Sequence, residues 1–348
     1  MLQFQAIRLL LLTGITFVIA LLITPLVTKL LFKYKAGKQI RSAVDAPIFS
    51  SLHKGKEGTP TMGGIIIWIS VLALALIFFL INYFFGDTWG YFNIINRAET
   101  YLPIAAMLIA ALLGLLDDIL GILRIGPKGG GISMKHKIAV YFIIGLIGAY
   151  WFFVKLGWTT LYIPFAGFFQ INGWYIPIFL FIIVASAFSA NETDGLDGLL
   201  GGVSLFSFAS LTVVAFVMGR FDLAVFTAMI VGALLAFLWF NIYPARFFMG
   251  DTGSMALGIT MGIIALLTNT ALLLPFFAPI LVLESLSVIV QLFSKKVFKR
   301  KIFLSTPIHH HFEALGWHES RVTMRFWIIS AVSNGLGLVI FFLSRMFV

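Results

Sequence analysis

The 348-residue sequence contains no cysteine, which excludes a disulfide framework and any thiolate metal site. Charge is scarce as well. Asp, Glu, Lys and Arg together make up 11% of the residues, whereas a soluble domain carries about 25%. So few charges exclude a cytosolic globular enzyme and a disordered chain. They also exclude a nucleic-acid-binding protein, although the net charge is +10.

What the chain has in quantity is hydrophobic residues, which make up 60% and include 37 Phe. A membrane-spanning helix needs about 20 mostly apolar residues, because its backbone must satisfy its own hydrogen bonds in hydrocarbon. Suitable runs lie near residues 9–32, 63–85, 101–116, 138–154, 175–190, 199–219, 222–242, 255–269, 275–294 and 326–347. The sequence therefore predicts an all-α polytopic membrane protein, a bundle of about ten transmembrane helices that forms one domain over residues 1–348.

The basic residues predict how the chain is oriented in the membrane. Polar segments that would share one side are 33–62, 117–137, 191–198, 243–254 and 295–325. The other side then keeps few of the 24 Lys and Arg residues, namely Arg8, Arg97, Lys155, Arg220 and Arg345. By the positive-inside rule the rich side is cytoplasmic, so both termini face outward.

A small external β-hairpin is predicted within residues 160–176. Apolar residues alternate along this stretch, and alternation is typical of a strand. Asn172-Gly173 is a favoured hairpin turn.

The first polar loop ends HKGKEGTPTMGG over residues 53–64 and has two interpretations. In the first, Lys56 and Thr59 face a phosphate, and the glycines let the backbone approach it closely. In the second, the lysines are a positive-inside anchor, followed by a helix start with Pro60 near its first turn.

Two adjacent aspartates, Asp117 and Asp118, end the third run. That run passes from outside to inside, so both acids lie at a helix C-terminus, where the macrodipole disfavours negative charge. They also repel each other. A divalent cation or a proton-transfer task would compensate this cost, and we therefore predict a functional role.

Acids also occur near three later runs. The segment NETDGLDG at residues 191–198 has more acids than a turn between two helices needs, and its spacing is not that of an EF-hand. Asp251 or Ser254 is explained equally well as an N-cap of the eighth run or as part of a polar site. Glu284 lies inside the ninth run, where an intramembrane acid is a functional candidate and a buried hydrogen bond to a neighbouring helix is the alternative.

The last polar loop carries a basic cluster and three consecutive histidines. The basic residues Lys295, Lys296, Lys299, Arg300 and Lys301 are expected to meet anionic headgroups. Histidines at adjacent positions cannot all face one metal from a regular helix, because helical ligands need i, i+4 spacing. This disfavours a zinc protease, and imidazole donors suit a polyanion such as a diphosphate better.

Carboxylates, lysines, histidines and glycine loops thus gather on the predicted cytoplasmic side. This combination predicts Mg²⁺-assisted chemistry on a phosphate ester. A transporter would more often place its coupling acids near the bilayer midplane, where only Glu284 lies.

In chain order, the motifs GTPTMGG, LLDD, NETDGLDGL, NIYPARFFMGDTGS and PIHHHFEALGW resemble those of the phospho-N-acetylmuramoyl-pentapeptide transferase family. This family lies within the polyprenyl-phosphate N-acetylhexosamine-1-phosphate transferase superfamily. The resemblance runs from about residue 54 to the C-terminus, and residues 307–317 carry its family-specific part. It implies transfer of phospho-N-acetylmuramoyl-pentapeptide from its UDP-linked donor to undecaprenyl phosphate, giving lipid I and UMP. It further implies Mg²⁺ as cofactor, peptidoglycan synthesis as the process and the bacterial inner (cytoplasmic) membrane as the location.

The resemblance also implies roles for matching residues. Asp251 resembles the Mg²⁺ ligand, and Asp117 and Asp118 resemble the carboxylates that serve the prenyl phosphate and catalysis. Residues implied in the nucleotide site are Asn191, Asp194, Gly195, Leu196 and Asp197, with Asn241 and Phe248 beside the uracil. Residues implied in phosphate and sugar contacts are Lys56, Lys137, His309, His310 and His311. One departure is Gly121, which stands where many members have a lysine, and the loop 126–131 is also extended.

Several alternatives stay open. Direct attack with Asp117 as base is favoured over a two-step route through an aspartate nucleophile. A sibling enzyme that uses UDP-N-acetylglucosamine is disfavoured by the HHHFEALGW segment. A lipid-linked transporter is the alternative from a different class. The sequence leaves the oligomeric state open, and a homodimer is one of the alternatives.

Overall fold

The computed structural model describes residues 2–34, 36–37, 56, 58–95, 98–127 and 130–347. Three features of the sequence lie partly or wholly outside these residues. They are the start of the family resemblance near Lys54, the outer-side residue Arg97, and the middle of the 126–131 loop.

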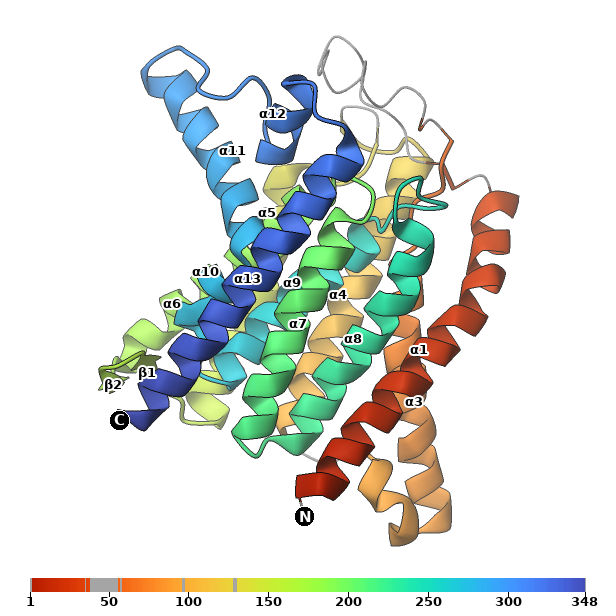
Figure 1. Cartoon of the computed structure of the whole chain (residues 1–348), viewed down its shortest axis with the longest axis vertical. Coiled ribbons are helices and arrows are strands. Elements are labelled where there is room, and N and C mark those ends of the chain that lie inside the picture. The colour runs from red at the N-terminus through yellow and green to blue at the C-terminus, as the bar shows by residue number, and fades with distance from the viewer. Residues whose placement is uncertain are drawn as a thin grey trace.

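Helices form most of the described structure (Figure 1). They are α1 (Leu2–Lys33), α3 (Ile65–Phe85), α4 (Ala98–Ile122), α5 (Met134–Tyr150), α6 (Tyr175–Thr193), α7 (Leu199–Val217), α8 (Phe221–Asn241), α9 (Asp251–Leu267), α10 (Leu274–Phe277), α11 (Pro279–Val297), α12 (Ile308–Ala314) and α13 (Glu319–Met346). Short 3₁₀ helices lie at Asp87–Phe92, Asn172–Trp174 and Ala271–Leu273, and a π-helical turn lies at Trp151–Lys155.

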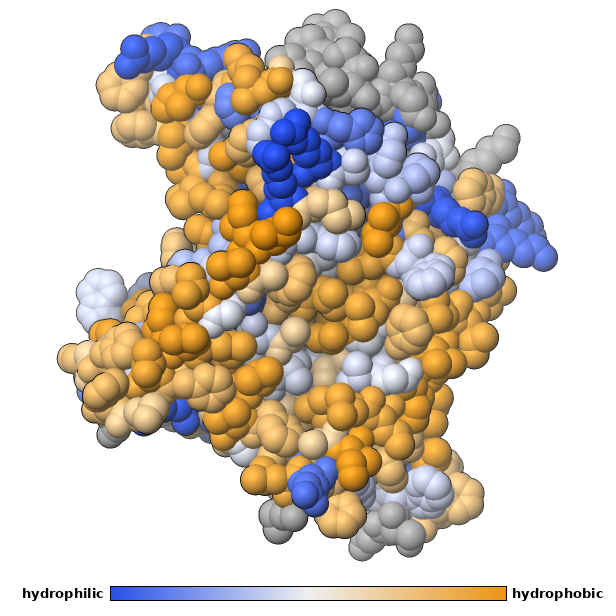
Figure 2. All heavy atoms as spheres, viewed as in Figure 1, coloured by the Kyte–Doolittle hydropathy of each residue, from blue (hydrophilic) through white to orange (hydrophobic). Residues whose placement is uncertain are grey.

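Every predicted run coincides with helix, and the all-α polytopic architecture is confirmed. Within the described residues, 8 helices are long and apolar enough to cross a membrane. Hydrophobic side chains cover most of the visible flank of the bundle, and the hydrophilic ones gather mainly toward its ends (Figure 2). Such a belt matches the hydrocarbon layer of a bilayer.

The sequence predicts one straight span for the ninth run, but the structure has two helices there. The helical stretch Ala271–Phe277, which ends with α10, meets α11 at a bend of 93°. The break falls at Ala278, whose ψ of 52° is not helical. Pro279 follows directly, and a proline disfavours the helical conformation of the residue before it. The run therefore becomes a short helix followed by a separate one.

The short helix α9 lies in the centre of the bundle, packed against α4 and α6. All of its residues after Asp251 are buried. Gly114 of α4 makes this packing close, because a Cβ at that position would overlap the carbonyl of Asp251. The next turn of α4 carries Asp117 and Asp118, which are thereby brought to the first residues of α9.

The predicted hairpin is present, but its turn is not where the sequence indicates. Strand β1 (Thr160–Ile163) pairs antiparallel with β2 (Gly167–Gln170), and Ile163 is opposite Gly167. The turn is therefore at residues 164–166, where Phe165 has a φ of 64°. Asn172-Gly173 instead begins the 3₁₀ helix that leads into α6. Both chain termini lie at the end of the bundle opposite α12 (Figure 1).

Candidate active site

A lysine bridges two aspartates at the end of the bundle that carries α12. The Lys137 ammonium, on α5, lies 2.6 Å from Oδ2 of Asp117 on α4 and 2.7 Å from Oδ2 of Asp251 on α9. The backbone N–H of Ile132 also donates to Asp117. The Asp117 side chain is 3% exposed and that of Asp251 is 21% exposed. Asp251 is thus the more accessible carboxylate of the pair.

Asp118 has a different environment from its neighbour. Its carboxylate accepts hydrogen bonds from the backbone N–H groups of Asp251 (3.2 Å) and Thr252 (3.0 Å). Asp118 therefore caps α9 from another helix, where a negative charge also meets the positive end of the helix dipole. The alternative that Asp251 or Ser254 is the N-cap of α9 is wrong, because Gly250 occupies that position and Asp251 is already the first helical residue.

The segment after α6 is tied to the start of α9. Asn191 donates its amide N–H to Asp251 and, at 3.4 Å, to the hydroxyl of Ser254. Asp194 accepts a hydrogen bond of 3.1 Å from the backbone N–H of Gly250. The predicted nucleotide residues thus lie beside the predicted metal ligand.

A second lysine is held by two acids from distant parts of the chain. The Lys56 ammonium lies 2.6 Å from Oδ1 of Asp197 and also pairs with Glu319, at the start of α13. Oδ2 of Asp197 accepts from the backbone N–H of Ala245 at 3.0 Å. The ring centroid of Phe248 lies 5.6 Å from the ammonium. Glu319 is not among the residues predicted from the sequence. Its only signal is its place just after the histidine motif, since an acid is ordinary in the first turn of a helix.

For three of the predicted substrate-binding residues, the structure gives less support for a contact with substrate. The side-chain amide of Asn241 is buried and bonded at both ends, because it accepts from Gly198 N–H (3.0 Å) and donates to the Phe247 carbonyl (2.8 Å). Leu196 belongs to the hydrophobic core. Thr59 is half-buried, and its backbone N–H donates to the Lys56 carbonyl at 3.1 Å.

The three histidines of α12 have three different partners. His309 is fully buried, with Nδ1 3.0 Å from Oε2 of Glu284 on α11. Nδ1 of His310 lies 2.6 Å from Glu313, and His311 accepts from the backbone N–H of Leu304 at 3.2 Å. Burial opposes the protonation of His309, but the carboxylates of Glu284, Glu313 and Glu192 together outweigh it and raise the pKa of this imidazole above its ordinary value.

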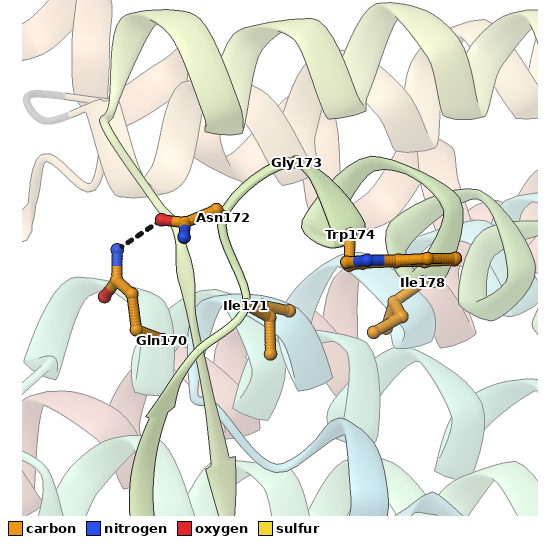
Figure 3. A pocket seen from close by; sticks show the side chains of 6 residues that line it. All are labelled: Gln170, Ile171, Asn172, Gly173, Trp174 and Ile178. Carbon is orange, nitrogen blue, oxygen red and sulfur yellow. Dashed lines mark hydrogen bonds between the residues drawn. The ribbon is translucent and has the colours of Figure 1, made fainter.

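A wide hollow of about 760 Å³ lies at the opposite end of the bundle and is distinct from this site (Figure 3). It is lined by residues of the segment that joins β2 to α6, and the Trp174 ring lies beside Ile178. None of its lining residues is charged. A site for phosphate chemistry needs convergent charged groups, and these gather around Lys137 and Lys56.

The carboxylates around Lys137 suit Mg²⁺ that is shared with a substrate. No group of three or more His, Cys, Asp or Glu side chains in the described part of the chain is arranged to hold a metal by itself. Mg²⁺ commonly uses one or two protein carboxylates together with substrate phosphates. Asp251, the more accessible of the two aspartates beside Lys137, supplies one such carboxylate.

Comparisons with known proteins agree with the motifs. A model described as glycosyl transferase family 4 matches residues 101–269. A phospho-N-acetylmuramoyl-pentapeptide-transferase signature matches residues 56–67. Proteins named phospho-N-acetylmuramoyl-pentapeptide-transferase are similar over most of the chain. One from Geobacillus thermodenitrificans is 36% identical, covering 94% of this chain and 96% of its own length. Another from Desulforamulus reducens is 37% identical, covering 94% and 93%.

Proposed function

The chain belongs to the phospho-N-acetylmuramoyl-pentapeptide-transferase family, and from this premise we propose that it transfers phospho-N-acetylmuramoyl-pentapeptide from its UDP-linked donor to undecaprenyl phosphate. The products are lipid I, used in peptidoglycan synthesis, and UMP. The reaction forms a bond between an oxygen of the prenyl phosphate and the β-phosphorus of the donor. It breaks the bond from that phosphorus to the UMP oxygen.

The observation that carries the proposal is the bridge of Lys137 between Asp117 and Asp251. Both substrates are anions, so their approach requires positive charge in a place shielded from water. Lys137 and Lys56 supply two such charges, each held in position by carboxylates. Hydrophilic side chains gather toward this end of the bundle, beyond the hydrophobic flank (Figure 2). The phosphate of a membrane lipid would lie at the same level.

Within this arrangement the aspartates have separate tasks. Asp117 is held by Lys137 and by the backbone N–H of Ile132, and it acts as the base for direct attack by the prenyl phosphate. Asp251 would hold Mg²⁺, which when bound would offset the negative charge of the donor diphosphate. Asn191 fixes the Asp251 side chain through its amide.

The proposed orientation places the site on the cytoplasmic side of the bacterial inner membrane, with both termini outside. Support comes from the basic residues. Lys295 and Lys296 lie in the last turn of α11, and Lys299, Arg300 and Lys301 lie in the loop that leads from it to α12. Positive charge of this kind marks cytoplasmic loops.

The test is UMP release by the purified protein in detergent, supplied with undecaprenyl phosphate and UDP-N-acetylmuramoyl-pentapeptide, with and without Mg²⁺. Parallel reactions contain UDP-N-acetylglucosamine as donor. We expect Mg²⁺-dependent release with the muramoyl donor alone. Release with UDP-N-acetylglucosamine alone would instead indicate the sibling enzyme, and no release from folded protein would contradict an enzymatic role.

A further inference from the structure

The carboxylate of Glu284 is fully buried in α11. The reaction proposed above gives this residue no role. A buried carboxylate is costly unless it is paired. Its Oε2 atom lies 3.0 Å from Nδ1 of His309 and accepts the backbone N–H of the same residue at 3.4 Å. The ring contact has the distance of an ion pair without hydrogen-bond alignment. One carboxylate oxygen thus contacts both the ring and the backbone of His309.

This contact is one of three through which α11 holds the segment that leads to the histidines. Two turns after Glu284, Gln291 accepts the backbone N–H groups of Ile302 (2.9 Å) and Phe303 (3.1 Å). Ser294 donates to the carbonyl of Arg300 at 2.9 Å. Neutral groups make the other two contacts. Only the contact with His309 uses a charge, so that charge needs an explanation beyond packing.

The other side of the His309 ring faces the loop that carries Asp194 and Asp197. A Cβ on Gly195 would overlap Nε2 of His309, so the imidazole lies directly against the backbone of this loop. Within the described residues, Nε2 of His309 and Oε1 of Glu284 have no hydrogen-bond partner. The ring is therefore placed by Glu284 on one side and by the loop backbone on the other.

We propose that Glu284 is a positioning residue for the donor nucleotide: its carboxylate fixes the His309 imidazole, and the imidazole sets the position of the loop 194–197. The inference rests on the proposed function. Displacing the loop shifts Asp194 from Gly250 and Asp197 from Lys56, which weakens binding of the UDP-linked donor. The acceptor side, built around Lys137, stays in place.

The charges around His309 favour an imidazolium in this position. Glu284 faces it from α11, His310 and Glu313 from α12, and Glu192 from α6. Burial of the ring opposes its charge, but the carboxylates of Glu284, Glu313 and Glu192 together reverse the balance and raise the pKa of His309, with Glu284 contributing most. The carboxylate and the imidazolium therefore neutralise each other in the buried space beneath the loop.

The first test is the kinetics of Glu284→Gln, which keeps the shape of the side chain and removes its charge. We expect the KM for the UDP-linked donor to rise about tenfold, with kcat within about twofold and an unchanged KM for undecaprenyl phosphate. Glu284→Asp keeps the charge and should recover part of the donor affinity. Glu99→Gln, the same chemical change near the opposite end, is the matched control and should behave as wild type. Wild-type constants for Glu284→Gln, or a loss confined to kcat, would overturn the proposal.

The second test asks whether Glu284 acts through His309. In a double-mutant cycle, Glu284→Gln should have no further effect on donor KM in a His309→Gln background. Independent effects of the two changes would overturn the inference.

A third test needs no variant at Glu284, in case that variant does not fold. The ¹⁵N spectrum of histidine-labelled wild-type protein, assigned with His309→Gln, should show His309 still as an imidazolium at a pH above the ordinary imidazole pKa of about 6.5. A neutral ring would overturn the proposal. Failure of the proposed function is distinguishable, because it would appear as absent UMP release by wild-type protein.

Discussion

The carboxylate of Asp118 accepts the backbone N–H of Asp251 at 3.2 Å, so one predicted catalytic aspartate caps the helix that begins with another. The two residues are 133 positions apart in the sequence. This contact fixes where α9 starts relative to α4. The buried side chain of one aspartate, Asp118, therefore positions the more accessible carboxylate of another, Asp251.

Replacing Asp118 by alanine should lower both stability and turnover. Loss of an N-cap costs about 1 kcal/mol, and the orphaned N–H groups of Asp251 and Thr252 would let the start of α9 move. Thermal unfolding in detergent and UMP release measure the two effects. Asp251→Asn is the comparison and should abolish turnover with little change in unfolding temperature. If Asp118→Ala had wild-type stability, the capping role would be refuted.

Removing the ammonium of Lys137 should make the stability of the protein depend on a divalent cation. In Lys137→Met the carboxylates of Asp117 and Asp251 lose the charge that separates them, and they repel each other. Mn²⁺ bound between them would offset this repulsion. At a concentration 100 times its Kd, it would raise the free energy of unfolding by about 2.7 kcal/mol. We expect Mn²⁺ to raise the unfolding temperature of this variant by several degrees more than that of wild type.

The matched control for this experiment is Lys135→Met, because Lys135 lies two residues earlier on the same helix and is exposed. Its unfolding temperature should respond to Mn²⁺ as wild type does. An equal response of Lys137→Met and Lys135→Met would contradict a cation site at Asp251.

The helices could be predicted from the sequence because hydrophobic length is a local property. The bend at Ala278 was missed, since the run on both sides of Pro279 is apolar. The hairpin turn was misplaced because Asn172-Gly173 is a strong local signal that strand register overrides.

The site could be predicted only in part, for a related reason. Residue types indicated that Asp117 and Asp251 matter, but their common contact with Lys137 depends on the packing of three helices. Glu319 carried no signal beyond its place just after the histidine motif, because its partners Lys56 and Asp197 come from distant loops. Asn241 looked like a ligand-binding amide, whereas the backbone of Gly198 and Phe247 uses both of its ends.

Gly195→Ala should weaken donor binding. The added Cβ would overlap Nε2 of His309, so either the ring or the loop must shift. We expect the KM for the UDP-linked donor to rise by about tenfold or more, which corresponds to about 1.4 kcal/mol. Gly335→Ala is the control, since a Cβ there meets nothing within 4 Å. Equal donor KM values for the two variants would show that the loop does not need this close contact.

The pair of Glu284 and His309 should make stability fall as pH rises. The pKa of His309 is raised in the folded protein, whereas in the unfolded chain it has its ordinary value of about 6.5. The folded state therefore binds the proton more tightly. The pair's contribution is fully present below that ordinary value and is lost as pH rises through the raised pKa. We expect the difference in unfolding temperature between wild type and Glu284→Gln to be largest below the ordinary pKa of about 6.5 and to shrink as the pH rises through the raised pKa of His309. A difference that stayed constant over this range would mean that Glu284 stabilises the fold without charging His309.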